Sequence, residues 1–261
     1  MTIALIDNGS LEPAAHRNLR AVAAALSTRL GVNVAPVSWR HSDRIPADAL
    51  EGAPASTLAR WLRDRVAAGD REFLFVPFFI SPQGAIGSAL RTELETLSAS
   101  LGGISFAFTA GLAEREALPA IVVARIRETI ASGRFARTAV LLVDHGGPSA
   151  TSAALRDALA TQVRALLGDE VPSLTAASME GAHGPLLAEA LATLTGDVIV
   201  APLFLSPGRH AGPAGDLARI AAASPARVHF TALVGTHPLA LDALAAALHD
   251  ALASSSTPLS A

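Results

Sequence analysis

The stretch FLFVPFFISPQG at residues 73–84 recurs as VIVAPLFLSPGR at residues 198–209. Both stretches are apolar runs of strand length that carry a proline in the middle and a Ser-Pro pair near the end. Apolar runs of this length, bounded by Pro and Gly, are typical of strands that are buried on both faces. The repetition predicts that the chain contains two copies of one structural pattern.

The same order of elements surrounds each copy. The first half is expected to form strands at residues 3–6, 32–39, 73–80 and 104–110, with helices at 13–30, 54–68, 86–97 and 118–131. The second half is expected to form strands at residues 140–143, 173–178, 198–205 and 228–234, with helices at 149–167, 185–194, 213–223 and 238–252. Apolar strands that alternate with amphipathic helices indicate a parallel sheet covered on both faces.

The sequence therefore predicts an α/β protein made of two tandem, similar, doubly wound halves that resemble the flavodoxin arrangement and face a cleft. The expected domains are residues 1–133 and 134–261, and the polar stretch at residues 254–261 is expected to be a frayed tail. Because the duplication already supplies both halves, a monomer is expected.

Composition excludes several classes of chemistry. All 20 basic residues are arginine, and the chain contains no lysine, cysteine or tyrosine. A P-loop lysine, a Schiff-base lysine, disulfides and thiolate metal sites are therefore excluded. The net charge of −3 gives no reason to expect nucleic acid or an anionic membrane as a partner. Since no apolar run approaches the roughly 18 residues that a membrane helix needs, we expect a cytoplasmic protein.

Three polar residues follow successive predicted strands of the second half. His145 follows the first strand, Glu180 the second and His210 the third. Ligands of such sheets bind in the crevice outside the carboxyl ends of the strands. Two neutral imidazoles on converging loops suit a borderline divalent cation, and a carboxylate nearby adds a ligand or a base. Taken singly, His145 also suits a helix cap and His210 a solvated loop.

The first half lacks these groups, because Asn8 and Ala85 stand where the second half has its histidines. The other histidines have weaker contexts: a loop near the site for His183, the start of the last helix for His237 and a helix surface for His16.

Two other functions remain as alternatives on the residues alone. The Gly-rich turns at residues 144–149 and 206–215 could present N–H groups to a phosphate. Neither turn matches a nucleotide-binding motif and lysine is absent, so a nucleotide enzyme is disfavoured. A hydrolase or isomerase could use Ser149 or Ser206 with a histidine, but the chain has no G-x-S-x-G elbow.

Several motifs of the second half together resemble the class II tetrapyrrole chelatases, and most closely the sirohydrochlorin chelatases in their long, two-domain form. These motifs are D-H-G-G at residues 144–147, E-G-x-x-x-P at 180–185, P-L-F-L-S-P-G-x-H at 202–210 and G-T-H-P at 235–238. The third motif is the most specific. One departure is Asp144, which stands where the family pattern has a small residue.

The resemblance implies insertion of a divalent metal into a sirohydrochlorin-like tetrapyrrole, without a nucleotide, in cobalamin or sirohaem biosynthesis. The metal would be Co²⁺ or Fe²⁺, with Ni²⁺ as a further candidate.

His145 and His210 resemble the family's metal-binding histidines, and Glu180 resembles its acidic active-site residue. Arg209 is a candidate to bind the carboxylates of the macrocycle, the alternative being a solvated loop arginine. With no histidines of this kind, the first half is expected to serve as a wall and lid. A non-catalytic tetrapyrrole or metal carrier of the same fold is the alternative function.

Overall fold

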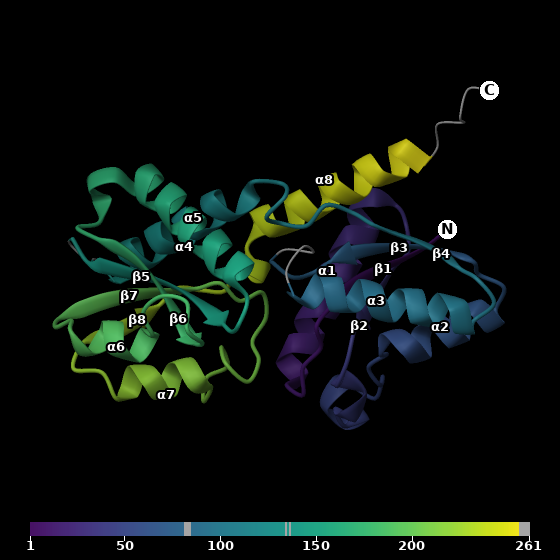
Figure 1. The fold of residues 1–261 in the computed structure, drawn as a ribbon, viewed down its shortest axis with the longest axis horizontal. Coiled ribbons are helices and arrows are strands. Elements are labelled where there is room, and N and C mark those ends of the chain that lie inside the picture. Colours follow the sequence, from purple (N-terminus) through teal and green to yellow (C-terminus); the bar gives the residue numbers. More distant parts are fainter. Residues whose placement is uncertain (81–84, 134, 136, 256–261) are drawn as a thin grey trace. The chain divides into compact units, whose positions relative to one another are not determined.

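The computed structural model describes residues 1–80, 85–133, 135 and 137–255. It contains two four-stranded parallel sheets with helices between the strands (Figure 1). The tail predicted at the end of the chain lies, from residue 256 on, outside the described residues. No helix in the described part of the chain is both long and apolar enough to cross a membrane.

The two sequence halves contain the same succession of strands and main helices. The elements of the first half are β1 (Thr2–Asp7), α1 (Pro13–Leu30), β2 (Val34–Ser38), η1 (Ser42–Arg44), η2 (Ala47–Leu50), α2 (Leu58–Ala67), β3 (Glu72–Pro77), α3 (Ala85–Ser100), β4 (Ser105–Phe108) and α4 (Ala117–Gly133). Those of the second half are β5 (Ala139–Gly146), α5 (Ala150–Leu167), η3 (Gly168–Glu170), β6 (Leu174–Glu180), α6 (Leu187–Ala192), β7 (Asp197–Pro202), α7 (Asp216–Ala222), β8 (Arg227–Phe230), η4 (Val234–Thr236) and α8 (Pro238–Ser255).

Strand order is the same in both sheets, β2-β1-β3-β4 in the first and β6-β5-β7-β8 in the second. Every pair of neighbouring strands is parallel. The first strand of each half, β1 or β5, therefore lies between the second and third strands of that half. Its carboxyl end lies between the carboxyl ends of these two neighbours. This order confirms the predicted α/β fold with two similar doubly wound halves.

Prolines end the third strand of each sheet. Pro77 closes β3 and Pro202 closes β7, because proline has no N–H with which to continue a ladder. The residue after each proline, Phe78 or Leu203, donates its N–H to the neighbouring central strand at 2.7 Å in both sheets. The sequence repeat thus reproduces the backbone geometry at the strand ends, where ligands bind in such folds.

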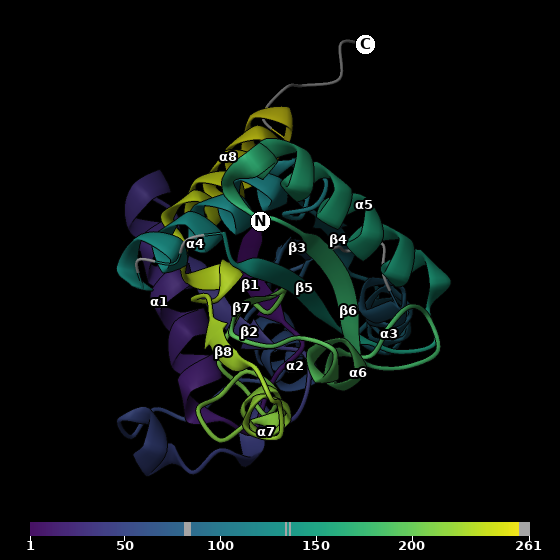
Figure 2. The same cartoon turned by 90° about the vertical axis from the view of Figure 1, so that its left-hand side faces the viewer.

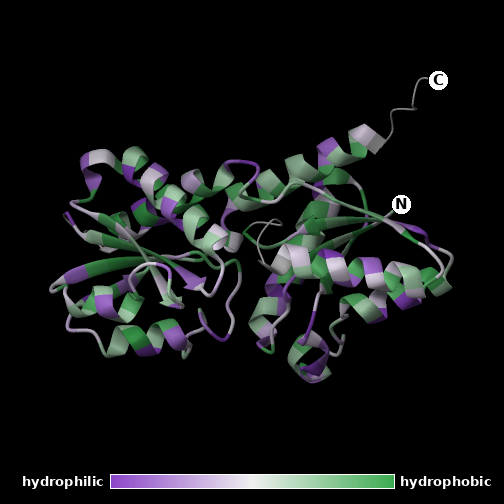
Figure 3. Cartoon of the chain, in the orientation of Figure 1, coloured by the Kyte–Doolittle hydropathy of each residue, from purple (hydrophilic) through white to green (hydrophobic). Residues whose placement is uncertain are grey.

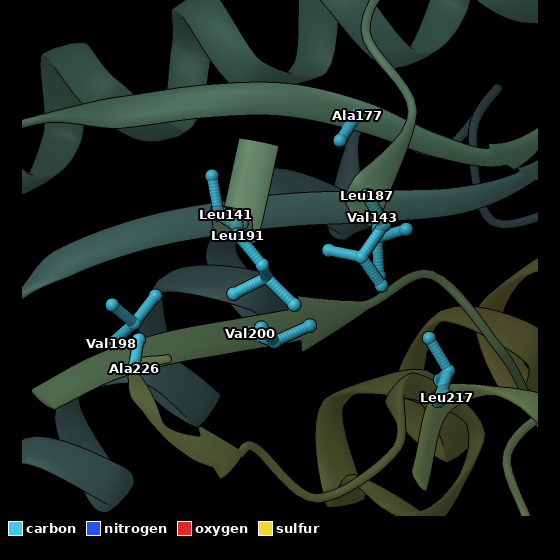
Figure 4. Packing of buried hydrophobic residues seen from close by; sticks show 9 residues of the cluster. All are labelled: Leu141, Val143, Ala177, Leu187, Leu191, Val198, Val200, Leu217 and Ala226. Carbon is cyan, nitrogen blue, oxygen red and sulfur yellow. The ribbon is translucent and has the colours of Figure 1, made fainter. Parts of the chain in front are cut away.

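Two pairs of helices cover the second sheet, α4 and α5 on one face and α6 and α7 on the other (Figures 1 and 2). The strands are predominantly apolar, whereas polar residues recur along the helices (Figure 3). The face toward α6 and α7 carries a buried apolar cluster (Figure 4), which consists of Leu141, Val143, Ala177, Leu187, Leu191, Val198, Val200, Leu217 and Ala226. Each fully buried Leu or Val contributes roughly 1.5–3 kcal/mol, so this cluster fixes the strands whose ends carry the candidate site.

The last helix of each sequence half packs with elements of the other half. Helix α4 packs on α5 and β7, and helix α8 packs on α1 and β3. The compact units are accordingly Met1–Arg115 with Pro238–Ala261, called the first unit, and Glu116–His237, called the second unit. These units differ from the predicted domains, residues 1–133 and 134–261, by the exchange of the two helices. An apolar stripe shows that a helix is buried but does not specify the sheet that buries it.

Tryptophan fluorescence can test this exchange, because Trp39 and Trp61 are the only tryptophans of the chain and both lie in the first unit. Replacing Leu248, a fully buried residue of α8, with alanine should destabilise that unit by roughly 2–5 kcal/mol. The denaturant midpoint followed by fluorescence should therefore fall. Ile126→Ala removes an equally buried side chain from α4 and should shift that midpoint less. A larger shift for Ile126→Ala would contradict the exchange.

Candidate active site

The three predicted site residues lie at one edge of the second sheet. His145 is near the end of β5, Glu180 is the last residue of β6, and His210 lies in the turn that follows β7. Because β5 pairs with both β6 and β7, the carboxyl ends of the three strands are adjacent. The fold therefore brings His145, Glu180 and His210 together within the second unit.

The two imidazoles form a close pair. The ring centroids of His145 and His210 are 4.6 Å apart and the ring planes make an angle of 72°. Two nitrogen ligands of one tetrahedral metal ion lie roughly 3–3.5 Å apart, a separation that rings at this distance allow. Glu180 lies alongside, with Oε1 3.6 Å from Nδ1 of His145. Among the described residues no group of three or more His, Asp or Glu is disposed to hold a metal, so the arrangement is an open pair and not a closed cage.

A glycine turn presses the end of β5 against the end of β6. Gly146 has φ 82°, a conformation that glycine adopts readily. A Cβ at this position would lie 1.9 Å from the carbonyl oxygen of Glu180, so no other residue fits. The N–H of Gly147 donates to the same oxygen at 3.3 Å. This close backbone contact sets His145 beside Glu180.

Asp216 holds the second imidazole. Nδ1 of His210 lies 2.6 Å from Oδ2 of Asp216, which is the first residue of α7. A carboxylate that accepts the Nδ1 proton fixes the tautomer and leaves Nε2 to bind a ligand. Helix α7 begins later than predicted because the chain folds back at Gly215, where a Cβ would lie 2.5 Å from the carbonyl oxygen of His210. Asp216 was not predicted from the sequence, although a carboxylate shortly after a candidate histidine was the available signal.

The surroundings of His210 favour its neutral form. Burial lowers the pKa of His210, the nearby His145 and Arg209 lower it further, and Glu180 opposes them. A neutral imidazole is the form that binds a metal.

Two exposed arginines share the same carboxylate. The guanidinium of Arg219 forms an ion pair with Asp216, and Nε of Arg209 lies 3.9 Å from Asp216 Oδ2. The Arg209 and Arg219 side chains are 84% and 72% exposed. A guanidinium carries five N–H donors, so one shared carboxylate leaves both groups with donors that face solvent.

A cavity of about 770 Å³ joins these groups. Apolar side chains from the end of β6 and from α6 and α7 form part of its wall, among them Met179, Leu191 and Ile220. The histidine pair, Glu180, Asp216 and both arginines complete the lining. Such a mixture suits a ligand with an apolar body and an anionic periphery.

The other residues considered from the sequence have structural partners. Nε2 of His183 lies 3.2 Å from the carbonyl oxygen of Pro148, which links the loops after β6 and β5. His237 is buried, with Nε2 3.5 Å from Glu128. Ser149 caps α5, since its hydroxyl accepts the N–H of Ser152.

The prediction for His16 was wrong. It was expected on a helix surface but is only 2% exposed, and its Nδ1 lies 3.4 Å from the hydroxyl of Ser38. Burial lowers the pKa of His16 to about 4, so the imidazole is neutral. A histidine in an amphipathic helix was expected to face solvent. His16 instead lies on the apolar stripe of α1, where the hydroxyl of Ser38 is the hydrogen-bond partner of its imidazole.

The first unit repeats the backbone of the site with different side chains. Gly9 has φ 85° and approaches the carbonyl oxygen of Arg40 so closely that a Cβ would lie 1.7 Å from it. Arg40 therefore takes the place of Glu180, and Asn8 takes the place of His145. Ala85 begins α3, and its side chain lies outside the described residues.

The CbiX family model matches residues 139–251, the part of the chain that carries His145, Glu180 and His210. No curated protein matches the chain.

Solved structures match the whole chain. "SirB from Bacillus subtilis with Fe3+" superimposes with a TM-score of 0.70 at 15% identity, over 98% of this chain and 97% of that one. The CbiX described as the terminal enzyme for biosynthesis of siroheme in denitrifying bacteria has a TM-score of 0.68 at 22% identity, over 96% and 99%. The sirohydrochlorin chelatase SirB from Bacillus subtilis subspecies spizizenii in complex with cobalt has a TM-score of 0.65 at 14% identity, over 96% and 95%.

At these identities the likeness establishes the fold of both halves, while the CbiX match concerns the second half. Together they confirm the resemblance that the motifs predict.

The role of Asp216 can be tested with the metal alone. Asp216→Asn keeps the shape of the side chain but removes the charge that holds the Nδ1 proton of His210, so Co²⁺ affinity should fall about 10–100-fold. Titration with Co²⁺, followed by visible absorption, measures the loss. Asp169→Asn makes the same chemical change on the exposed η3 turn of the same unit and should leave the affinity unchanged. Equal affinities for the two variants would exclude this role.

Proposed function

We propose that this protein, whose second half matches CbiX and whose fold is that of solved sirohydrochlorin chelatases, inserts a divalent metal into sirohydrochlorin without ATP. The metal is a substrate, Co²⁺ or Fe²⁺, with Ni²⁺ as a third candidate. Relatives are described with Fe³⁺ and with cobalt. The observation that carries the proposal is the His145–His210 pair beside Glu180 in one cavity.

The histidine pair suits a metal that must be handed over. Neutral imidazoles are borderline donors that bind first-row divalent metals. Two such ligands leave coordination positions open, so pyrrole nitrogens can enter before His145 and His210 dissociate. A site with more protein ligands would hold the metal more tightly and oppose its transfer.

Insertion must also remove protons. As the metal enters, two pyrrole N–H protons leave, and the dianionic macrocycle balances the charge of M²⁺. Glu180 is the exposed carboxylate beside the histidine pair, 3.6 Å from Nδ1 of His145 and 64% exposed at its side chain, whereas Asp216 is engaged with Nδ1 of His210. An exposed carboxylate can accept a proton and pass it to water. Its role in the proposal is to accept pyrrole protons in turn.

The arginines on the cavity wall complement the substrate. Sirohydrochlorin carries many carboxylates around an apolar ring system, and guanidinium groups bind carboxylates in bidentate geometry. Arg209 and Arg219 line the same cavity as the apolar side chains of α6 and α7. We therefore assign both arginines to carboxylates at the edge of the macrocycle, with the apolar wall against its face.

A tetrapyrrole or metal carrier of the same fold is the second candidate. It is favoured by the first unit, which has Asn8 and Arg40 in place of metal-binding groups. Turnover separates the two functions, because a carrier binds Co²⁺ and sirohydrochlorin without joining them.

We also propose that the protein is a cytoplasmic monomer and that the metallated product serves cobalamin or sirohaem synthesis.

Metallation of sirohydrochlorin, followed by its absorption change with each metal, is the direct test. His145→Ala and His210→Ala should abolish insertion and leave the fold intact, because each removes a ligand from the strand-end loops and not from the core. Asn8→Ala is the matched control in the first unit and should have a mild effect, since an amide is a poor ligand for these metals. Equal losses for Asn8→Ala and His145→Ala would refute the assignment of the chemistry to the second unit. Binding without turnover in the wild type would favour the carrier.

Arg219→Met tests substrate recognition. Losing one charge-assisted contact should raise KM for the tetrapyrrole about tenfold, which corresponds to ~1.4 kcal/mol, with Co²⁺ affinity close to that of the wild type. Arg227→Met is the control. Arg227 is about as exposed as Arg219, but it is paired with Asp197 at the amino ends of β7 and β8, away from the candidate site. The assignment fails if the two variants have the same KM.

A further inference from the structure

A buried arginine lies directly beneath the candidate site. Arg156, on α5, is only 2% exposed. A buried cation is costly unless its donors are fully paired. Among the described residues no buried side-chain nitrogen or oxygen lacks a hydrogen-bond partner. The buried guanidinium nitrogens of Arg156 are therefore all paired.

The partners of Arg156 come from the two strand ends and the loop that carry the site. Its guanidinium is hydrogen-bonded to the Ser178 hydroxyl of β6 and lies 3.4 Å from Oδ1 of Asp144 on β5. It also donates at 3.1 Å to the carbonyl oxygen of His183 in the loop after β6. Ser178 in turn donates to Asp144 at 2.8 Å, which closes the network.

These partners are neighbours of the site residues along the chain. Asp144 immediately precedes His145, and Ser178 lies two positions before Glu180 on the same face of β6. A shift of Arg156 would therefore move both strand ends. Asp157 completes the pairing of the guanidinium, at 2.7 Å from Nη2.

The first unit shows that the fold does not require an arginine here. Helices α1 and α5 have the same length, and the seventh residue is Leu19 in α1 and Arg156 in α5. Leu19 is fully buried. Asp7 and Ser38 repeat Asp144 and Ser178, and without a cation beside it burial raises the pKa of Asp7 to about 6. The unit with the cation is the one that carries the histidine pair.

We propose that Arg156 is a positioning residue that ties the ends of β5 and β6 to the following loop, and so holds His145 in place to share a metal with His210, with Glu180 beside it. The inference rests on the proposed function for the identity of the ligand. Asp144, the departure from the family motif seen in the sequence, then acts as the partner of this arginine. The role of Arg156 is geometric, because the side chain is only 2% exposed and is not among the residues that line the cavity.

The variant Arg156→Leu introduces the residue that the first unit has at this position, although there His16 contacts the equivalent hydroxyl of Ser38. Co²⁺ affinity should fall about 10–100-fold, the usual effect of removing a group that orients metal ligands. The visible absorption of bound Co²⁺ should also change, because its ligand geometry changes. Arg156→Lys keeps a cation but loses the planar fork, so its affinity and spectrum should lie between those of Arg156→Leu and the wild type. Arg164→Leu, on the same helix with a bond to the carbonyl of Gly168, should match the wild type.

Thermal unfolding of the same samples separates positioning from stability. A lowered midpoint for Arg156→Leu together with a wild-type Co²⁺ affinity and spectrum would overturn the proposal, as would a loss that Arg164→Leu shares. Failure of the proposed function has a different signature, in which the wild type binds Co²⁺ but does not metallate sirohydrochlorin. The test of Arg156 uses the metal alone and remains decisive in that case.

Discussion

The candidate site depends on one close backbone contact, that of Gly146 with the carbonyl oxygen of Glu180. A Cβ at Gly146 would lie 1.9 Å from that oxygen, so the turn after β5 closes only because no side chain is present. The contact presses two neighbouring strand ends together, and His145 and Glu180 follow. The third strand then adds His210 from its own turn. Three residues distant in the sequence meet because parallel strands end at one edge.

The same contact is present in the first unit, where Gly9 meets the carbonyl oxygen of Arg40. Backbone geometry alone therefore does not make a metal site. The side chains differ in charge and in donor type, since Asn8 and Arg40 replace an imidazole and a carboxylate. Both turns need glycine for the same steric reason, because a Cβ would meet a carbonyl oxygen near the end of the neighbouring strand. If the chemistry takes place in the second unit alone, as proposed, the residues that project from the turn of the first unit need not be metal ligands.

The sequence was sufficient to predict most elements and the edge at which the site lies. The apolar runs around Pro77 and Pro202 predict strands and their repetition predicts two similar halves, but both strands end at the proline and not at residues 80 and 205 as expected. The exchange of α4 and α8 could not be predicted, because both helices bury an apolar stripe and either sheet could accept it. Asp216 and Arg156 were also not predicted from the sequence as part of the site. Asp216 lies six positions after its partner His210, so their spacing was a usable signal. Arg156 meets Ser178, 22 positions away, and no spacing in a single sequence reveals that contact.

Exposure divides the site into a rigid base and an accessible surface. Arg156 and Ser178 are each 2% exposed and bind one another beneath the strand ends, in surroundings where polar groups must be paired. Above them the side chains of His145 and Glu180 are 45% and 64% exposed. A site that transfers its metal needs both properties, since fixed ligands shorten the search for the reactive geometry and open coordination positions let the product leave. A fully buried cage would provide the first property at the expense of the second. Under the proposed function, the buried network supports side chains that must themselves remain accessible.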